Sequence, residues 1–210
     1  MRLYHNPLSS NARRAVMAAM YLGVPVDLQF VDLAKGANRT PAYLALNPNH
    51  KVPVLDDNGF VLWESYAIMQ YLAEKTPGQS IYPTDGEARA DVNRWLFWCA
   101  QHFSPAIGIL NWEHHIKPLA GLGKVDAQEA ARGEQLVREF GAILDGHLAD
   151  REWICGATIT LADIAIAAPL ADIESAKLPV GDFSNVQRWF AQIRALDVWR
   201  RTEPQLPLNG

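Results

Sequence analysis

The strongest constraint on the fold is a strand-helix-strand pattern at the start of the chain. Residues 3–5 are predicted as a short strand that Asn6-Pro7 stops, and residues 11–22 place apolar side chains at helical spacing before Gly23. Residues 26–30 then alternate apolar and polar side chains, which is the period of a half-buried strand. A helix that connects two successive strands implies that these strands are parallel.

A second pair of strands follows. Residues 52–55 and 60–63 are apolar runs around Asp57-Asn58-Gly59, and Asn-Gly between two such runs is a strong signal for an antiparallel hairpin. A short helical turn around residues 43–44 precedes the hairpin, and a helix that begins at Glu64-Ser65 follows it. The order β-α-β-(α)-β-β-α predicts an α/β domain.

From residue 87 onward the sequence has helical periodicity and no strand pattern. We expect helices at about 87–103, 128–149, 160–171 and 184–196. The second of these has an apolar stripe, which consists of Leu136, Phe140, Ile143, Leu144 and Leu148. The predicted organisation is therefore an α/β domain over residues 1–79, a linker over 80–86 and an all-α domain over 87–210.

Composition and charge exclude several classes of protein. The chain has 210 residues and a net charge of −4, so it offers no basic field for nucleic acid or anionic lipid. No apolar run approaches the length of a membrane span, and the N-terminus lacks the apolar segment of a secretory signal. Cys99 and Cys155 lie far apart, without metal-ligand spacing. We expect a cytoplasmic protein without disulfides, metal or nucleic-acid partner.

Pro53 interrupts the first strand of the hairpin pattern. A proline there donates no ladder hydrogen bond, so its simplest interpretation is an ordinary edge-strand residue. The alternative is a cis Val52-Pro53 bond, which leaves the backbone N–H and C=O of Val52 exposed for pairing with a peptide-like ligand.

Three further loops carry polar residues that have both a structural and a functional interpretation. Ser9, Ser10 and Asn11 precede a helix, where they serve as an N-cap or favour an anion such as a thiolate. Glu64-Ser65 is either an exposed acid with an N-cap serine or a clamp for an α-amino-acid head group. His50-Lys51 is either a solvated loop or a pair of cations for a second carboxylate.

These loops are expected at the same end of a thioredoxin-like sheet, where open α/β folds bind ligands. Together they provide a thiolate site, a backbone pairing site, an amino-acid clamp and a carboxylate clamp. The tripeptide γ-Glu-Cys-Gly requires all four.

The sequence resembles the cytosolic glutathione transferases over essentially its whole length. Three segments in the family's order carry the resemblance: residues 47–55 (Asn-Pro-Asn-His-Lys-Val-Pro-Val-Leu), 64–68 (Glu-Ser-Tyr-Ala-Ile) and 160–163 (Thr-Leu-Ala-Asp). The last looks like the family's capping box, in which a threonine and an acid satisfy orphan N–H groups of a helix. The resemblance implies a thioredoxin-like domain followed by an all-α domain, with glutathione as co-substrate and no other cofactor.

The resemblance also implies roles for individual residues. Ser9 matches the hydroxyl that activates the glutathione sulfur in serine-type members, and Ser10 stands where the bacterial beta class has cysteine. The remaining matches concern glutathione binding: His50, Lys51 and, more weakly, Asn38 on the glycine side, Val52-Pro53 at the cysteinyl backbone, and Glu64 and Ser65 at the γ-glutamyl group. Tyr66 departs from the arginine that some members have next.

The absence of cysteine at positions 9 and 10 bears on the reaction. Without a thiol there, the protein forms no mixed disulfide at this point, which disfavours glutaredoxin-like reduction. Tyr4 is the tyrosine-type candidate for thiol activation, but it lies within the first strand rather than in the loop, so it ranks below Ser9. Ser10 and Asn11 are the other catalytic candidates.

The electrophile is expected against the helical domain. Trp112 and His115 flank a flexible stretch at residues 118–123 and are the preferred wall residues. Glu113-His114-His115 is discounted as a zinc site, because adjacent helical residues diverge by about 100°.

The sequence therefore predicts a serine-type, bacterial theta/beta-like glutathione transferase that conjugates small hydrophobic electrophiles and forms a homodimer. The alternatives are a glutathione-dependent peroxidase, dehalogenase or isomerase, and a non-catalytic binding or regulatory protein with the same fold.

Overall fold

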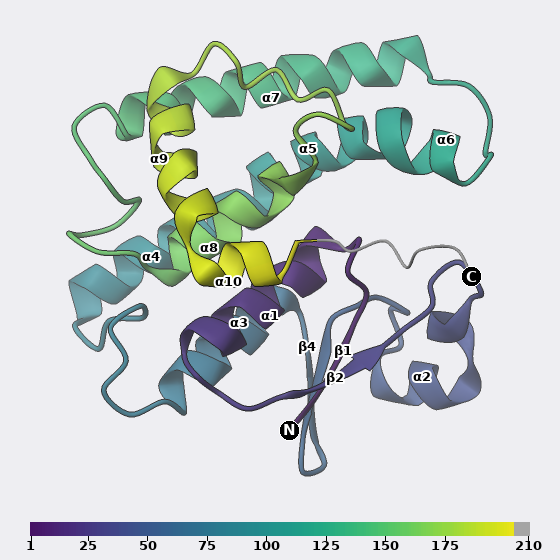
Figure 1. Cartoon of the computed structure of the whole chain (residues 1–210), viewed down its shortest axis with the longest axis vertical. Coiled ribbons are helices and arrows are strands. Elements are labelled where there is room, and N and C mark those ends of the chain that lie inside the picture. Colours follow the sequence, from purple (N-terminus) through teal and green to yellow (C-terminus); the bar gives the residue numbers. More distant parts are fainter. Residues whose placement is uncertain (204–210) are drawn as a thin grey trace. The chain divides into compact units, whose positions relative to one another are not determined.

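The strand-helix-strand unit is present in the computed structural model of the chain, which describes residues 1–203 (Figure 1). Strand β1 (Arg2–His5) is followed by helix α1 (Ser10–Tyr21) and strand β2 (Asp27–Phe30). β1 and β2 pair in parallel, with Leu3 opposite Leu28. The predicted crossover connection is confirmed.

The hairpin is also confirmed. Strands β3 (Val54–Asp57) and β4 (Phe60–Trp63) pair antiparallel, and β3 pairs antiparallel with β1. The resulting sheet has the order β2-β1-β3-β4. β3 begins directly after Pro53, and the Val52-Pro53 peptide bond is cis. The interpretation of Pro53 as an ordinary edge-strand residue is therefore wrong.

Each face of the sheet carries its own apolar cluster, because successive side chains of a strand point to opposite faces. Leu3 and Leu55 pack against α1 and against α3 (Ser65–Glu74). Tyr4 and Val54 belong to a second cluster, which contains Tyr43 from α2 (Pro41–Leu46). α2 thus lies on the other side of the sheet from α1 and α3 (Figure 1).

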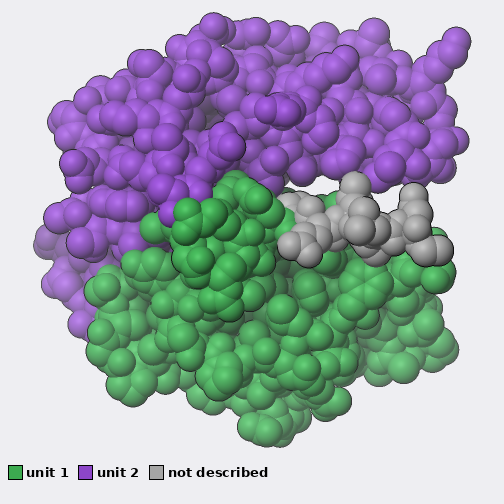
Figure 2. All heavy atoms as spheres, in the orientation of Figure 1, with its two compact units in different colours: residues 1–82, 196–210 green, residues 83–195 purple. Residues whose placement is uncertain are grey.

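The chain divides into two compact units (Figure 2). The first contains residues 1–82 together with the described residues from 196 onward, and the second contains residues 83–195. Besides the elements above, the first unit has a 3-10 turn (Ala37–Arg39) and helix α10 (Asp197–Arg201). The predicted helical domain over residues 87–210 is therefore too long, because residues 196–203 belong to the first unit.

The described part of the second unit is helical. It consists of α4 (Gly86–Trp98), a π-helical turn (Cys99–Phe103), α5 (Ser104–Asn111), a second π-helical turn (Trp112–Ile116), α6 (Lys117–Leu119), α7 (Ala127–His147), α8 (Leu161–Ala167), a 3-10 turn (Ala168–Asp172) and α9 (Ser184–Ala195). Among residues 1–203, no helix combines the length and apolar character that a bilayer crossing requires.

Helical backbone continues without a break from residue 86 to residue 119, beyond the end expected near residue 103. Pro105 and Pro118 lie inside this stretch. Each is the second residue of the α-helix that follows a π-helical turn. A proline lacks an N–H and crowds the preceding turn, and a wider π turn accommodates both defects. The two π turns explain why these prolines do not end the helix.

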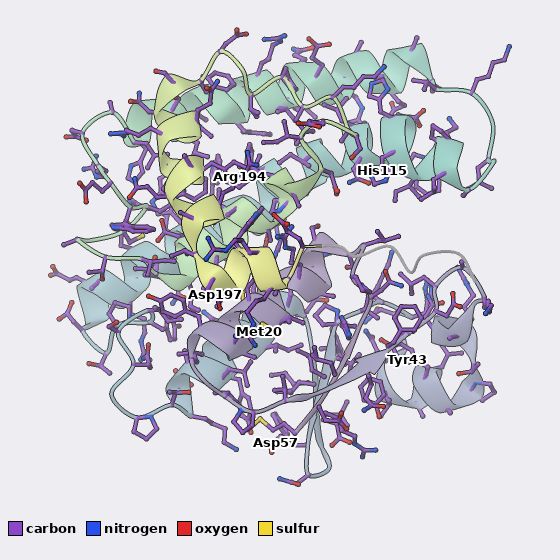
Figure 3. The ribbon with its side chains drawn as sticks, in the orientation of Figure 1. Met20, Tyr43, Asp57, His115, Arg194 and Asp197 are labelled. Atoms are coloured by element: carbon purple, nitrogen blue, oxygen red, sulfur yellow. The ribbon has the colours of Figure 1, made fainter. Side chains whose placement is uncertain are left out.

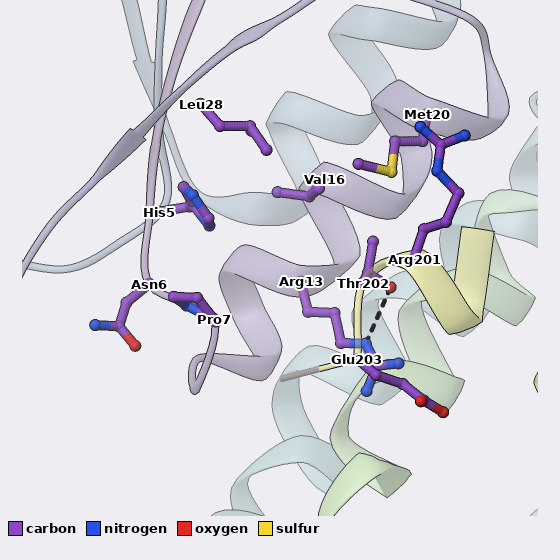
Figure 4. Close-up of a pocket in the computed structure, with 10 residues that line it drawn as sticks. All are labelled: His5, Asn6, Pro7, Arg13, Val16, Met20, Leu28, Arg201, Thr202 and Glu203. Carbon is purple, nitrogen blue, oxygen red and sulfur yellow. Dashed lines mark hydrogen bonds between the residues drawn. The ribbon is translucent and has the colours of Figure 1, made fainter. Parts of the chain in front are cut away.

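The sequence did not predict α10, which is attached to α1 by a buried arginine. The Arg13 guanidinium lies over the Trp199 ring, 3.8 Å from its centroid, and Nη2 donates to the Trp199 carbonyl at 3.0 Å. Arg13 Nε also donates to Thr202 Oγ1 at 3.2 Å (Figure 4). A hollow of about 230 Å³ lies beside this contact, lined by residues of β1, α1, β2 and the end of α10, with His5 among them. Burial lowers the pKa of His5.

The apolar stripe of α7 differs in part from the one expected. Leu144 and Leu148 are fully buried, but Ile143 is 49% exposed. The buried face instead includes Gly133, Val137 and Gly141. A Cβ atom at Gly141 would overlap the Phe183 ring, so glycine is needed there for close packing.

Thr160 and Asp163 form the predicted capping box at the start of α8. The buried Asp163 carboxylate accepts four hydrogen bonds, from Thr160 N and Oγ1 at 2.7 and 2.9 Å, and from Ile154 N and Trp189 Nε1, both at 2.9 Å. Burial raises the pKa of Asp163, although the four donors favour the charged form. The Asp163 side chain therefore joins α8 to α9, through Trp189, and to the loop before α8, through Ile154.

Gly141→Ala is expected to lower the free energy of unfolding by about 1–3 kcal/mol, because its methyl group overpacks against Phe183. Gly146→Ala is the matched control on the same helix, since a Cβ there meets nothing within 4 Å. That control should stabilise the protein by about 0.5–1 kcal/mol through helix propensity. Urea unfolding of both variants measures the difference, and equal effects would contradict the packing argument.

Asp163→Asn is expected to destabilise the protein by about 3 kcal/mol or more, because an amide group replaces an oxygen that accepts two hydrogen bonds. Asp150→Asn, at a carboxylate whose side chain is 78% exposed, should stay within about 0.5 kcal/mol of the original protein. Denaturant midpoints of the two variants provide the test. A small change at Asp163 would show that the buried network is not required.

Candidate functional site

Loops at one end of the sheet enclose a hollow of about 310 Å³, which we call the Ser9 pocket. Its lining consists of Ser9, Asn11, Leu33, Asn38, Arg39, His50, Lys51 and Val52. Six of these residues were predicted as site residues from the sequence. The structure thus brings together the hydroxyl loop before α1, the polar stretch before α2 and the loop before β3.

Ser9 is the N-cap of α1, and its Oγ accepts a hydrogen bond from Ala12 N at 3.2 Å. This bond uses a lone pair of the oxygen and leaves the hydroxyl hydrogen for another acceptor. The structural and functional interpretations of Ser9 are therefore compatible. Ser10 is the first residue of α1 and does not contribute to the described lining, whereas the exposed Asn11 does.

Asn6 holds the loop that carries Ser9. Its buried side chain donates from Nδ2 to the Val31 carbonyl at 2.9 Å and accepts from Leu8 N at 3.0 Å. Its own carbonyl accepts from Ser9 N at 3.0 Å. From the sequence alone Asn6 is predicted only as a strand stop, because a single buried amide has no sequence signature.

The loop of residues 50–52 is held by side chains that precede it in sequence. Asn38 Nδ2 donates to the His50 carbonyl at 2.8 Å, so the amide group of this predicted glycine-side residue is already engaged. Tyr43 Oη and Asn47 Nδ2 donate to the Lys51 carbonyl at 2.8 and 2.9 Å. Figure 3 shows Tyr43 beside the sheet. His50 adopts a left-handed φ of 48° within this loop.

Three residues with positively charged or ionisable side chains are part of the lining of the Ser9 pocket, and we call them its cationic wall. Arg39 lines the pocket together with His50 and Lys51. Arg39 was not among the residues predicted for the site, although it ends the polar stretch that leads to α2. Such a wall is suited to a carboxylate.

Glu64 and Ser65 begin α3 but are not part of the described lining of the Ser9 pocket, and neither is Pro53. Glu64 is the exposed N-cap residue, and its φ of 73° is unusual for a residue other than glycine. Such backbone strain is common at ligand-binding sites. Ser65 is the buried first residue of the helix, so its interpretation as an N-cap serine is wrong.

Tyr66, the residue after Ser65, contacts a buried arginine of α1. The ring of Tyr66 lies 4.4 Å from the guanidinium carbon of Arg14, which is fully buried. The pair belongs to the first unit and packs α1 against the start of α3.

The second-substrate candidates lie on the second π-helical turn of the second unit. Trp112 is 46% exposed. His115 Nδ1 is 3.3 Å from Ser175 Oγ and 4.0 Å from the Asp172 carboxylate. These contacts place an aromatic surface beside a polar cluster.

The neighbouring Glu113 is buried and already engaged. Its carboxylate accepts hydrogen bonds from Asp126 N at 2.6 Å and from Lys117 Nζ at 2.9 Å, and these two bonds, the first above all, lower the pKa of Glu113. It therefore anchors the loop before α7. Within residues 1–203, no group of three or more His, Cys, Asp and Glu side chains has an arrangement that could hold a metal ion.

The sequence matches two family models. Residues 1–74 match the glutathione S-transferase N-terminal domain, and residues 127–192 match the glutathione S-transferase C-terminal domain. Among curated proteins, glutathione S-transferase D7 of Drosophila melanogaster is 32% identical over 189 residues, which cover 89% of this chain and 81% of the relative.

Solved structures agree with these matches. A theta-class glutathione S-transferase from Xanthomonas axonopodis pv. citri, with glutathione bound, is 30% identical and has a TM-score of 0.89, covering 98% of this chain and 97% of that one. A delta-class glutathione transferase from Nilaparvata lugens is 32% identical with a TM-score of 0.82, covering 96% and 94%. On the strength of its sequence and its fold, the chain belongs to the glutathione S-transferase family.

Proposed function

We propose that this glutathione transferase binds glutathione in the Ser9 pocket, stabilises its thiolate with the Ser9 hydroxyl and conjugates it to small hydrophobic electrophiles. The observation that supports this proposal most directly is the hydrogen bonding of the Ser9 hydroxyl. Its oxygen caps α1 as an acceptor, so its hydrogen remains available to a thiolate at the N-terminus of the same helix.

The Ser9 hydroxyl and the N-terminus of α1 together can supply the free energy that thiol activation requires. A free thiol has a pKa near 8.5, and lowering it by about 2 units requires about 2.7 kcal/mol of preferential thiolate stabilisation. A hydrogen bond to a charged group contributes about 1.5–3 kcal/mol, and a helix N-terminus adds about 0.3–2 kcal/mol. Serine therefore acts as a donor and need not act as a base.

The reaction we propose forms a carbon–sulfur bond. The thiol proton passes to solvent, the thiolate electron pair attacks the electrophilic carbon, and a leaving group departs with its bonding electrons or a double bond accepts them. Positioning the two reactants together supplies the rest of the rate enhancement.

The other proposed contacts pair residues of the protein with the charged groups of glutathione. The wall formed by Arg39, His50 and Lys51 suits the glycine carboxylate. Glu64 suits the γ-glutamyl ammonium group, and the Ser65 hydroxyl suits the γ-glutamyl carboxylate. Trp112 and His115 remain the candidates for contact with the electrophile.

Peroxidase, dehalogenase or isomerase activity with glutathione uses the same activated thiolate. Assays with organic peroxides, haloalkanes and isomerisable substrates beside conjugation substrates distinguish these activities. A non-catalytic binding role is disfavoured, because the hydroxyl loop and the cationic wall share one pocket. The homodimer and the cytoplasmic location stay predictions from the resemblance and the sequence.

Ser9→Ala is expected to lower the conjugation rate by one to three orders of magnitude, with a small change in glutathione affinity, because the donor to the thiolate is lost. An ultraviolet titration of bound glutathione measures the thiol pKa, which should rise toward the value for the free tripeptide. Asp85→Ala removes the N-cap of α4 in the second unit and controls for the cost of losing a cap. An unshifted thiol pKa in Ser9→Ala would assign activation to Ser10, Asn11 or Tyr4.

Glu64→Gln and Ser65→Ala are each expected to raise the dissociation constant of glutathione about tenfold while leaving kcat at saturation largely unchanged. Glu87→Gln makes the same charge change at an exposed position in the first turn of α4 and should have no effect. Calorimetric titration with glutathione measures the three affinities. Unchanged affinity in both site variants would rule out the head-group clamp.

A further inference from the structure

The peptide group between Lys51 and Val52 is held by two side chains that are not themselves part of the described pocket lining. Tyr43 Oη and Asn47 Nδ2 both donate to the Lys51 carbonyl oxygen, at 2.8 and 2.9 Å. Neither side chain is among the residues that line the Ser9 pocket, whereas Val52 is. The two hydrogen bonds therefore act on the pocket through the backbone of this loop.

The geometry of a peptide group makes this contact directional. The Lys51 carbonyl and the Val52 N–H belong to one planar trans peptide group, in which the C=O and N–H bonds point in opposite directions. Fixing the oxygen with two hydrogen bonds therefore fixes the direction of the N–H, which points away from Tyr43 and Asn47. That N–H is the donor proposed to pair with the cysteinyl backbone of glutathione.

We propose that the Tyr43 hydroxyl is a positioning residue of the glutathione site, which orients the Val52 N–H for the cysteinyl carbonyl of the bound tripeptide. This inference rests on the proposed function, since it concerns the same ligand. It adds a residue from α2, on the face of the sheet opposite α1 and α3.

The ring and the hydroxyl of Tyr43 have separate roles. The ring is buried in the apolar cluster with Ala12, Val52 and Val54 and meets Tyr4 edge-on, at 6.1 Å between centroids. The hydroxyl is the part that reaches Lys51. Burial and the neighbouring Tyr4 raise the pKa of Tyr43 to about 12, so the hydroxyl keeps its proton wherever a glutathione thiol titrates.

Asn47 limits how much the loss of the hydroxyl can change. Its side chain is buried and is itself fixed, because Oδ1 accepts from Asn49 N at 3.0 Å. Without the Tyr43 hydroxyl, one donor still satisfies the Lys51 oxygen, but the peptide plane gains freedom to rotate about that bond. The expected result is a weaker hydrogen bond to the ligand rather than a lost fold.

The test is Tyr43→Phe, which removes the hydroxyl and keeps the ring. We expect the dissociation constant of glutathione, measured by calorimetry, to rise about fivefold to tenfold. S-methylglutathione, which has no thiol, should lose affinity by the same factor. The pKa of bound glutathione thiol should stay as in the original protein, because Ser9 is unchanged.

Tyr71→Phe is the matched control. The Tyr71 hydroxyl also donates one hydrogen bond, to Asp57 at 2.7 Å, and it accepts a longer one from Lys75 Nζ at 3.3 Å. It lies in the same unit but is not part of the described pocket lining. Both variants should lower the denaturation midpoint by a similar amount, and only Tyr43→Phe should weaken glutathione binding.

Two outcomes overturn the inference while the proposed function stands. One is binding of glutathione to Tyr43→Phe within twofold of the original protein, and the other is equal weakening in both tyrosine variants, which would indicate general destabilisation. Failure of the original protein to bind glutathione would instead overturn the proposed function, and this inference with it.

Discussion

Two buried asparagine side chains hold the loops on which the candidate site depends. Asn6 donates to the Val31 carbonyl and accepts from Leu8 N, and Asn47 donates to the Lys51 carbonyl and accepts from Asn49 N. Each amide thus replaces backbone hydrogen bonds that an irregular loop cannot make with itself. A buried amide left without its partners is costly, so each loop is confined to one conformation.

The position of Ser9 shows how one side chain serves both folding and chemistry. A helix N-terminus needs an acceptor for its free N–H groups, and a thiolate needs a donor. A hydroxyl provides both at once, whereas a carboxylate at the N-cap would repel the thiolate. Glu64 differs from Ser9 in this respect. It occupies the N-cap position of α3 at a φ of 73°, but its side chain accepts no hydrogen bond from the helix N-terminus.

In the second unit, packing overrides local sequence signals. Pro105 and Pro118 are accommodated by π-helical turns, so the backbone stays helical to Leu119. The Asp163 carboxylate links α8 and α9, and its four donors make a buried charge tolerable. Trp112 and His115 lie on one of the π turns, where the local geometry departs from that of an α-helix.

The sequence by itself determined the strands, the parallel pair β1–β2, the antiparallel hairpin β3–β4, the capping box and the chemical types of the candidate site residues, because these follow from periodicity, turn residues and short spacings. Only the tertiary structure decided that Arg39 joins the pocket wall, that α10 packs against α1 and that Tyr43 and Asn47 hold the Lys51 carbonyl. Each of these depends on where a loop backbone directs its polar groups, and residue type does not encode that direction. It is fixed only when buried side chains leave the loop a single way to satisfy its hydrogen bonds.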